Sequence, residues 1–299
     1  MSSPLVSICL PIYNGAAFLR EAMDGVIAQT YENLEIVVSD DQSKDDSLAI
    51  IESYRVKTSI PIHIHSHTPS GIGANWNNCV KEASGKYIKF VFQDDLITKD
   101  CVAKMVAVAE TDDNVGLVFS TRTILYDEGN SKHVKWMSVC GTLHDHWGRL
   151  HTVNDGKTLL KNAYLLNRPR NKIGEPSVTL IRKSVFDRIG YFDVNLRQVL
   201  DYEFYYRMMP YYRIGFLDEK LASFRLHDLQ ATAVNSTDEA RISYEKKFVR
   251  KMFYDDMYKY LHPWVKLKLK REFHPLESAI YRLKRGIRSM ISGTTPREL

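Results

Sequence analysis

Short hydrophobic runs alternate with segments of helical periodicity along the first 120 residues. The hydrophobic runs are rich in β-branched residues and lie at 5–10, 34–39, 61–65, 86–92 and 115–120. Four segments between them repeat hydrophobic residues every three or four positions: two follow Asn14 and Ser43, and two span 74–84 and 99–110. Strands that alternate with helices in this way indicate an α/β fold with a mostly parallel sheet. Asn14 is the expected N-cap of the first helix.

The hydrophobic pattern weakens after residue 120. Residues 121–170 are charged and rich in histidine, and we expect an irregular insertion there, with one helix near 155–166. The pattern then predicts a strand at 176–182, a helix at 184–189 stopped by Gly190, a helix at 200–209 and a strand at 221–227. Residues 237–290 are predicted to be mainly helical. The chain therefore divides into a domain at 1–236 and a helical extension at 237–299.

The composition is that of an ordinary globular protein, with 44% hydrophobic and 26% charged residues. The four cysteines are scattered and form no C-x-x-C pair, which favours reduced thiols in a cytoplasmic protein over a zinc site or a disulfide framework. The N-terminus lacks the pattern of a secretory signal. No stretch reaches the roughly 18 apolar residues that a membrane-spanning helix needs.

The net charge of +5 is unevenly distributed along the chain. Residues 241–299 hold fifteen Lys and Arg against six Asp and Glu, so the first 240 residues are mildly acidic. The cations of this basic tail are mixed with Trp, Tyr, Phe and Leu, a composition typical of a helix that lies on an anionic membrane surface. The alternative is a helical pair packed on the domain with a solvated basic face. The tail has no nucleic-acid-binding motif, so no nucleic-acid partner is expected.

Three of the expected strands end in a polar cluster: PIYN at 11–14, Asp40 with Asp41, and Asp94 with Asp95. Ligands of open α/β sheets bind beyond the carboxyl ends of the strands, so the three clusters are expected to line one crevice. Two neighbouring carboxylates repel each other unless a cation lies near them. Oxygen ligands of this type suit Mg²⁺ or Mn²⁺. The alternative for Asp94 or Asp95 is that it caps the following helix.

Several of these segments, taken in order, resemble family-2 glycosyltransferases with the GT-A fold. The matching segments are PIYN at 11–14, DDQSKDDS at 40–47, GIGANWN at 71–77 and ASGKYIKF at 83–90, followed by the acidic pair at 94 and 95. The resemblance covers roughly residues 5–230. It implies a Rossmann-like GT-A domain at 1–236, in which residues 1–120 bind the nucleotide and residues 121–236 bind the acceptor. The residues at 237–299 form a basic helical extension to it.

The resemblance also implies an activity. Such enzymes transfer a sugar, with inversion, from a nucleotide diphosphate-sugar to a hydroxyl of a glycan or lipid-linked glycan. A UDP- or dTDP-linked hexose or deoxyhexose is the expected donor, and the expected role is synthesis of a bacterial surface polysaccharide such as lipopolysaccharide at the cytoplasmic face of the membrane. Two alternatives are a catalytically impaired module that binds nucleotide sugars or glycans, and a sugar nucleotidyltransferase. PIYNGAAF lacks the basic residues with which a nucleotidyltransferase would grip a triphosphate.

Carried over position by position, the resemblance assigns a donor site. Asp41 is expected to accept a hydrogen bond from the pyrimidine N3–H, Tyr13 to lie near the base, and Gln93 to lie near the ribose. The full set of residues expected to bind the nucleotide is Pro11, Tyr13, Asn14, Asp40, Asp41, Gly73, Asn77, Gln93 and Asp94.

The resemblance further implies a divalent cation, Mg²⁺ or Mn²⁺, bound by Asp94 together with Asp95 and His227. The usual metal motif is D-x-D, and here Phe92 stands in place of the first acid. The missing acid predicts a cation that is held more weakly than in most relatives.

The catalytic base implied by the resemblance is Asp201, whose carboxylate would take the proton of the acceptor hydroxyl. Leu200 stands where the family usually has another acid, and Glu203 is the second candidate base. Glu175 is expected in a loop that approaches donor and acceptor. The three imidazoles of HIHSH at 63–67 would share one strand face, which we expect to be a solvent-facing edge and not a metal site.

Overall fold

The computed structural model describes residues 3–227, 230, 235, 237–281 and 283. These residues form a sheet of nine strands in the order β3-β2-β1-β4-β8-β6-β9-β5, with β7 paired to β9. The strands are β1 (Val6–Ile12), β2 (Leu34–Asp40), β3 (Ile62–Ser66), β4 (Tyr87–Phe90), β5 (Leu96–Ile97), β6 (Val115–Leu125), β7 (Val153–Asp155), β8 (Thr179–Arg182) and β9 (Arg213–Arg225).

Parallel ladders join β3, β2, β1 and β4, as the alternating pattern predicted. β8 then runs antiparallel to both β4 and β6. β9 is parallel to β6 but antiparallel to β5 and β7. The α/β fold class is confirmed, and the second half of its sheet is mixed. β8 can run antiparallel because it enters the sheet after the long 126–178 segment and not through a single crossover helix.

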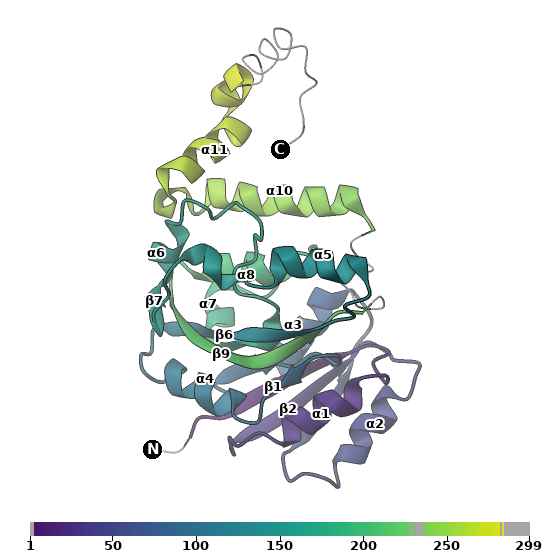
Figure 1. Cartoon of the computed structure of the whole chain (residues 1–299). Coiled ribbons are helices and arrows are strands. Elements are labelled where there is room, and N and C mark those ends of the chain that lie inside the picture. Colours follow the sequence, from purple (N-terminus) through teal and green to yellow (C-terminus); the bar gives the residue numbers. More distant parts are fainter. Residues whose placement is uncertain (1–2, 228–229, 231–234, 236, 282, 284–299) are drawn as a thin grey trace.

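Helices cover both faces of the sheet, with α4 on one side and α7 and α8 on the other (Figure 1). The helices are α1 (Leu19–Ile27), α2 (Ser47–Tyr54), α3 (Ile72–Glu82), α4 (Cys101–Ala109), α5 (Ser131–Cys140), α6 (Gly156–Leu160), α7 (Ser184–Ile189), α8 (Leu200–Met208), α10 (Glu239–Asp255) and α11 (Pro263–Phe273). Short 3-10 helices lie at η1 (His144–Trp147), η2 (Pro176–Val178) and η3 (Tyr258–Tyr260).

The segment between β1 and α1 differs from the expectation. Helix α1 begins at Leu19, so Asn14 is not its N-cap. Asn14 instead adopts a left-handed conformation with a φ of 48°, and its Oδ1 accepts a hydrogen bond from the Lys44 N–H at 2.8 Å. Its own N–H donates to the Ser43 hydroxyl at 3.0 Å. Asn14 therefore joins the β1 tip to the loop that follows β2.

The segment at 121–170 is more regular than expected. Strand β6 continues to Leu125 and pairs with β9 along most of its length, and α5 and β7 follow it. The helix expected near 155–166 is present but spans only Gly156–Leu160. The interpretation of this segment as an irregular insertion is wrong.

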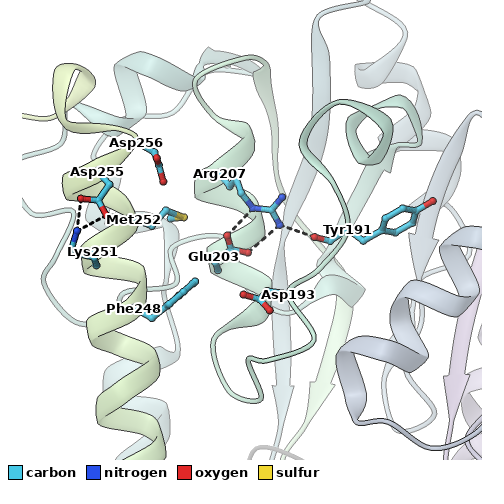
Figure 2. A pocket seen from close by; sticks show the side chains of 9 residues that line it. All are labelled: Tyr191, Asp193, Glu203, Arg207, Phe248, Lys251, Met252, Asp255 and Asp256. Atoms are coloured by element: carbon cyan, nitrogen blue, oxygen red, sulfur yellow. Dashed lines mark hydrogen bonds and ion pairs between the residues drawn. The ribbon is translucent and has the colours of Figure 1, made fainter.

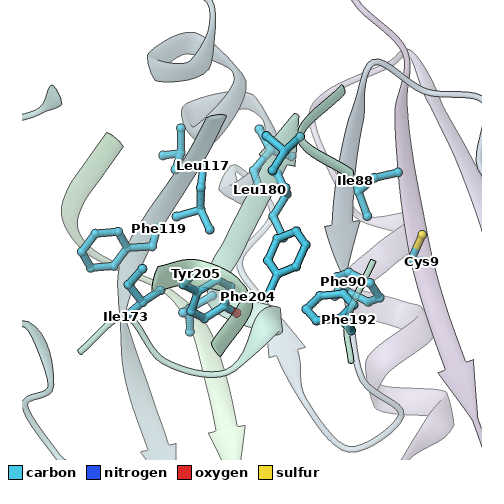
Figure 3. Packing of buried hydrophobic residues seen from close by; sticks show 14 of the residues in the cluster. Cys9, Ile88, Phe90, Leu117, Phe119, Ile173, Leu180, Phe192, Phe204 and Tyr205 are labelled. Atoms are coloured by element: carbon cyan, nitrogen blue, oxygen red, sulfur yellow. The ribbon is translucent and has the colours of Figure 1, made fainter. Parts of the chain in front are cut away.

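An aromatic cluster fixes α8 against the centre of the sheet (Figure 3). Phe204 of α8 is fully buried, and its ring centroid lies 4.5 Å from that of Phe192 and 4.8 Å from that of Phe186. Phe192 in turn contacts Phe90 of β4, with centroids 5.8 Å apart. Aromatic pairs at these separations add about 0.5–1.5 kcal/mol each to the stability gained from burial. The N-terminus of α8 is therefore held at a defined place above β4 and β8.

The basic tail packs on the domain through α10. Phe253 of α10 is buried against Tyr206 of α8, with ring centroids 5.1 Å apart. The fully buried Glu245 accepts hydrogen bonds from the backbone N–H groups of Arg197 and Gln198, both at 2.9 Å. Helix α11 packs against α10 through buried residues such as Leu269. The structure therefore shows the alternative arrangement: α10 packs on the domain, and α11 packs on α10.

Asn77 of α3 fixes the loop that leads into α8. Its Oδ1 accepts a hydrogen bond from the Phe192 N–H at 3.0 Å, and its Nδ2 donates to the Phe192 carbonyl at 2.9 Å. The side chain is buried. Both backbone groups of Phe192 thus depend on one amide.

We expect Asn77→Ala to lower the free energy of unfolding by about 2–4 kcal/mol, because two buried backbone groups of Phe192 lose their partners. Urea unfolding measures the change. Asn114→Ala, at an exposed turn, is the control and is expected to stay within about 0.5 kcal/mol of the wild type. An equally small effect of Asn77→Ala would show that the two hydrogen bonds between Asn77 and the Phe192 backbone are dispensable.

Candidate active site

The tips of β1 and β2 lie side by side at one edge of the sheet. Ile12 and Asp40 are register partners in the parallel ladder, and the Asp41 N–H donates to the Ile12 carbonyl at 3.0 Å. Pro11 is buried within β1 opposite Ser39. The first two polar clusters therefore meet, as the sequence predicted.

Gln93 brings the β4 tip to the same place. Its Oε1 accepts a hydrogen bond from the Tyr13 N–H at 2.9 Å, and its Nε2 donates to the Tyr13 carbonyl at 3.1 Å. The Tyr13 side chain is 55% exposed, so its ring is free to contact a ligand. The third polar cluster, which contains Asp94, is thereby tied to the first.

Asp40 and Asp41 have different surroundings. Both carboxylate oxygens of the buried Asp40 accept hydrogen bonds from the Ser43 N–H at 3.2 Å, so this side chain holds the loop. Asp41 Oδ1 lies 2.9 Å from His67 Nδ1, but the pair lacks hydrogen-bond geometry and both atoms are buried without a hydrogen-bond partner. Burial raises the pKa of Asp41, which the nearby His67 lowers and Asp40 raises. Because Oδ1 is enclosed beside His67 and the side chain is 12% exposed, Oδ2 is the Asp41 oxygen left to accept a hydrogen bond from a ligand.

His67 is a residue that sequence reasoning missed. The three imidazoles of HIHSH were expected to face solvent, yet the exposed fraction of the side chain falls from 51% at His63 to 33% at His65 and 16% at His67. The expectation is wrong for His67 because β3 ends beside the Asp41 loop. The backbone N–H of His67 also donates a hydrogen bond to the Asp40 carbonyl at 3.2 Å.

Gly73 and Asn77 lie behind the strand tips. A Cβ on Gly73 would meet Leu200 Cδ1 at 3.2 Å, so this position allows α3 to approach α8 closely. Both amide atoms of Asn77 are hydrogen-bonded to the Phe192 backbone and not directed at a ligand. Asn75 reaches the tips instead: its Nδ2 donates to the Ile12 carbonyl at 3.2 Å, and its Oδ1 is buried without a partner. The GIGANWN segment thus anchors α3 to the β1 tip through Asn75.

Asp94 and His227 form a close pair. Asp94 Oδ2 lies 2.9 Å from His227 Nε2, and the two side chains are 19% and 21% exposed. Asp95 differs from them because it is buried and its oxygens face the protein. Ser177 donates its hydroxyl hydrogen to Asp95 Oδ2, and the Arg225 N–H donates to Oδ1 at 3.2 Å. Burial and the charge of Asp94 raise the pKa of Asp95 above its usual range.

A divalent cation fits the pair of Asp94 and His227. Asp94 Oδ2 and His227 Nε2 lie at hydrogen-bond distance, 2.9 Å, so a cation would bind by taking the place of this hydrogen bond. Mg²⁺ commonly takes only one or two protein ligands together with substrate phosphates. In the part of the chain that the structure describes, no group of three or more His, Cys, Asp or Glu side chains is arranged to hold a metal ion.

Asp201 lies in the first turn of α8, and both its oxygens are held. The Tyr202 N–H donates to Oδ1 and the Asn171 amide donates to Oδ2, each at 2.7 Å. Burial raises the pKa of Asp201 to about 7, and the nearby charge of Glu175 adds to the increase. A carboxylate with a pKa near neutrality is well matched to accept a proton from a hydroxyl.

The loop at 171–175 is held by its own amides. Asn171 Oδ1 accepts hydrogen bonds from the N–H groups of Ile173 and Gly174, at 3.0 and 2.9 Å. Glu175 lies 3.1 Å from Arg122 of β6. Asn171 and Arg122 were not foreseen, since neither belongs to a recognisable motif.

A chain of contacts joins these groups from Asp41 to Asp201. The β2 tip contacts β1, Tyr13 contacts Gln93 beside Asp94, and Asp95 contacts Ser177 two residues after Glu175. Glu175 acts electrostatically on both Asp95 and Asp201. These contacts connect the strand tips that carry Asp41 and Asp94 to the loop that binds Asp201.

The model of the glycosyl transferase family 2 matches residues 7–190, more than half of the chain. The chain belongs to glycosyltransferase family 2. Uncharacterized glycosyltransferase RT0329 of Rickettsia typhi is 30% identical to it over 251 residues, which cover 79% of this chain and 69% of that protein. Uncharacterized protein MT1568 of Mycobacterium tuberculosis is 29% identical over 248 residues, covering 81% of this chain and 75% of that protein.

Solved structures confirm the GT-A fold of this family-2 transferase. TarS of S. aureus in complex with UDP-GlcNAc has a TM-score of 0.64 and 20% identity, and the match covers 90% of this chain and 71% of that chain. The mannosyltransferase PcManGT from Pyrobaculum calidifontis, in complex with GDP-Man and Mn²⁺, has a TM-score of 0.56 and 15% identity over 97% of this chain and 81% of that chain.

Glu203, the second candidate base of this family-2 transferase, lies apart from Asp201. It is buried and pairs with Arg207, its Oε1 accepting a hydrogen bond from Nε at 2.7 Å. Glu203 and Arg207 line a cavity of about 420 Å³ between α8 and α10, together with Asp193 and Phe248 (Figure 2). Residues two apart on a helix point to different faces, so the two acids cannot serve one site.

Proposed function

We propose that this chain transfers a sugar from a nucleotide diphosphate-sugar to a hydroxyl of a glycan or lipid-linked glycan, with inversion at the anomeric carbon. The observation that carries the proposal is the Asp201 carboxylate, which is held by two hydrogen bonds and whose pKa burial raises to about 7. Asn171 joins it to the loop whose Ser177 binds Asp95, next to Asp94. Membership of glycosyltransferase family 2 supports the transfer.

The donor end of the site is the group of strand tips. An ionised carboxylate only accepts hydrogen bonds, so Asp41 suits the N3–H of uracil or thymine. The exposed ring of Tyr13 lies on the adjacent tip, where it can pack on the base. The structural neighbour TarS, solved with UDP-GlcNAc, supports a UDP-linked donor. We propose a UDP- or dTDP-linked hexose or deoxyhexose.

The reaction follows from the position of Asp201. Its carboxylate takes the proton of the acceptor hydroxyl while the acceptor oxygen bonds to the anomeric carbon of the donor sugar. The bond from that carbon to the diphosphate oxygen breaks on the opposite face, and the nucleoside diphosphate leaves with the electron pair. Asn171 and the Tyr202 N–H keep the carboxylate in the orientation that receives the proton.

Asp94 and His227 would hold a divalent cation beside the leaving group. When bound, Mg²⁺ or Mn²⁺ supplies positive charge that offsets the charge developing on the diphosphate. We assign Asp95 a positioning role, because its oxygens are bonded to Ser177 and Arg225. The complex of PcManGT with Mn²⁺ supports use of a cation in this fold.

We expect Asp201→Asn to lower kcat by about 10²–10⁴-fold, because the acceptor proton loses its base. Release of nucleoside diphosphate from a panel of UDP- and dTDP-sugars with glycan acceptors measures the effect. Glu203→Gln is the matched control and is expected to retain turnover. For the wild type, kcat/KM should rise with pH and level off above a midpoint of about 7, since Asp201 must be deprotonated.

Retained turnover in Asp201→Asn, together with loss in Glu203→Gln, would contradict the assignment of the base. NMR analysis of the product anomer tests inversion separately. A product with the anomeric configuration of the donor would rule out single displacement.

We expect Mn²⁺ to raise the melting temperature of the UDP complex by about 5 °C or more at saturating concentrations. Asp94→Asn should abolish this increment and leave the effect of UDP alone, because the cation loses its carboxylate ligand. Asp187→Asn, at an exposed position of α7, is the control. A Mn²⁺ increment that survives in Asp94→Asn would place the cation elsewhere.

We also propose that the acceptor is met at an anionic membrane surface, as in synthesis of a surface polysaccharide or lipopolysaccharide at the cytoplasmic face. No helix among the described residues is long and apolar enough to cross a bilayer. The helical segment 275–281 and Leu283 expose Leu276, Ile280 and Leu283 at 71%, 50% and 67%. This i, i+4, i+7 spacing forms one apolar helix face beside the basic residues of α11.

Flotation of the full chain with phosphatidylglycerol vesicles tests membrane attachment. Substitution of Leu276, Ile280 and Leu283 by Gln is expected to lower the bound fraction at least about tenfold, because each buried leucine or isoleucine contributes about 1.5–3 kcal/mol. Val56→Gln, at a 92% exposed position far from the tail, is the control. Unchanged flotation of the triple variant would exclude this face as the attachment site.

A further inference from the structure

The carboxylate of Glu245, on α10, lies at the beginning of α8. It is fully buried, and its two oxygens accept hydrogen bonds from the backbone N–H groups of Arg197 and Gln198, each at 2.9 Å. These two residues directly precede Val199, the N-cap of α8, whose own side chain forms no capping hydrogen bond. Hydrogen bonds from backbone N–H groups to a carboxylate are stronger than those between neutral groups. Glu245 therefore helps to fix the place where α8 begins.

Arg241, one turn before Glu245 on α10, completes this contact. Its Nε donates to Glu245 Oε1 at 2.9 Å, and its Nη2 donates to the Asn195 carbonyl. A buried carboxylate needs such partners, because burial without them is strongly unfavourable. The loop before α8 is thus bound to α10 at the backbone of residues 195, 197 and 198.

Helix α10 also supports the loop that holds the second oxygen of Asp201. The buried Phe253 packs on Tyr206 of α8, with ring centroids 5.1 Å apart, and the Tyr206 hydroxyl donates to the Arg170 carbonyl at 2.6 Å. Arg170 directly precedes Asn171, whose amide donates to Asp201 Oδ2 at 2.7 Å. Phe253 therefore contacts the side chain that fixes the 170–171 backbone.

Both contacts of α10 lead to the candidate base. Oδ1 of Asp201 is bound by the Tyr202 N–H, in the first turn of the helix whose beginning Glu245 fixes. Oδ2 is bound by Asn171, next to the backbone that Tyr206 holds. Helix α10 lies beyond residues 7–190, to which the family model is matched. The extension thus contributes contacts that the family signature does not include.

We propose that Glu245 is a positioning residue for the transfer reaction, which holds the beginning of α8 so that the Asp201 carboxylate faces the acceptor hydroxyl. The proposal rests on Asp201 being the base, as in the proposed function. A displacement of about 1 Å can lower the rate of an enzyme reaction by about 10²-fold. Donor binding is assigned to the strand tips, at the other end of the chain of contacts, so the effect falls on kcat and not on the KM of the donor.

Steady-state kinetics of full-length Glu245→Gln, with the donor and acceptor that the wild type uses, tests the proposal. Gln has the shape of Glu but a single acceptor oxygen, so one of the two backbone N–H groups loses its partner. We expect kcat per folded molecule to fall by about 10–10²-fold and the donor KM to stay within about twofold. Urea unfolding gives the folded fraction of each variant.

Glu272→Gln is the matched control. It removes the ion pair that joins α11 to Arg250 of α10, in which Glu272 Oε2 lies 2.8 Å from Nε, and leaves the contacts of α10 with the loop before α8 in place. Its kcat is expected to stay within about twofold of the wild type, since surface substitutions have small effects.

The double variant Asp201→Asn/Glu245→Gln separates positioning from a general loss of structure. If Glu245 acts through Asp201, the double variant turns over as slowly as Asp201→Asn, within about twofold, because no base is left to misplace. Arg241→Gln, at a partly exposed position, is the second variant should Glu245→Gln fold poorly, and it is expected to lower kcat by about threefold or more.

A wild-type kcat in folded Glu245→Gln would overturn the proposal, as would a wild-type kcat in Arg241→Gln where Glu245→Gln does not fold. Equal losses from Glu245→Gln in the wild-type and Asp201→Asn backgrounds would also overturn it, because they would show a role independent of the base. Normal turnover in Asp201→Asn would instead overturn the assigned base, and a wild type that transfers no sugar would overturn the proposed function, so the failures are distinguishable.

Discussion

The buried carboxylate of Asp95 joins three segments that are far apart in the sequence. It accepts hydrogen bonds from Ser177, in the loop before β8, and from the Arg225 N–H at the end of β9. Lys89, fully buried on β4, donates to the Ser177 carbonyl from the other side. A buried carboxyl group without such hydrogen-bond partners would be unfavourable, so the three segments are constrained to meet. The hydrogen bonds of Asp95 therefore bring together Asp94, the loop before β8 and the end of β9.

Much of the fold follows from local patterns along the chain. The runs that form β1, β2 and β4 are buried along their whole length and mostly apolar because both faces of the sheet are covered, and their parallel order brings their polar ends together. The same reasoning fails for α5, which buries no residue and so has no apolar stripe to detect. It also fails at Asn14, where a left-handed turn replaced the expected helix cap because residues 43 and 44 bind its backbone and side chain.

In the candidate site, too, local sequence patterns identified some residues and missed others. Motifs located Asp41, Asp94 and Asp201, since each carries chemistry that a short segment can reveal. Asn171 was not detectable because its partner Asp201 is 30 residues away and its own segment has no periodic pattern. Ser177 lies 82 residues from Asp95, and their contact exists only after β8 has joined the sheet. Position within the fold, more than residue type, separates Asp201 from the nearby Glu203.

Phe92, which stands where the resemblance places the first acid of a D-x-D motif, has a structural role of its own. The Phe92 ring stacks on Trp76 of α3 with centroids 5.0 Å apart, and Trp76 also contacts Phe90 and Phe192. A carboxylate at position 92 would place a charge against this aromatic cluster. Phe92 therefore fastens the end of β4 to α3, and an acid at this position would give up that fastening.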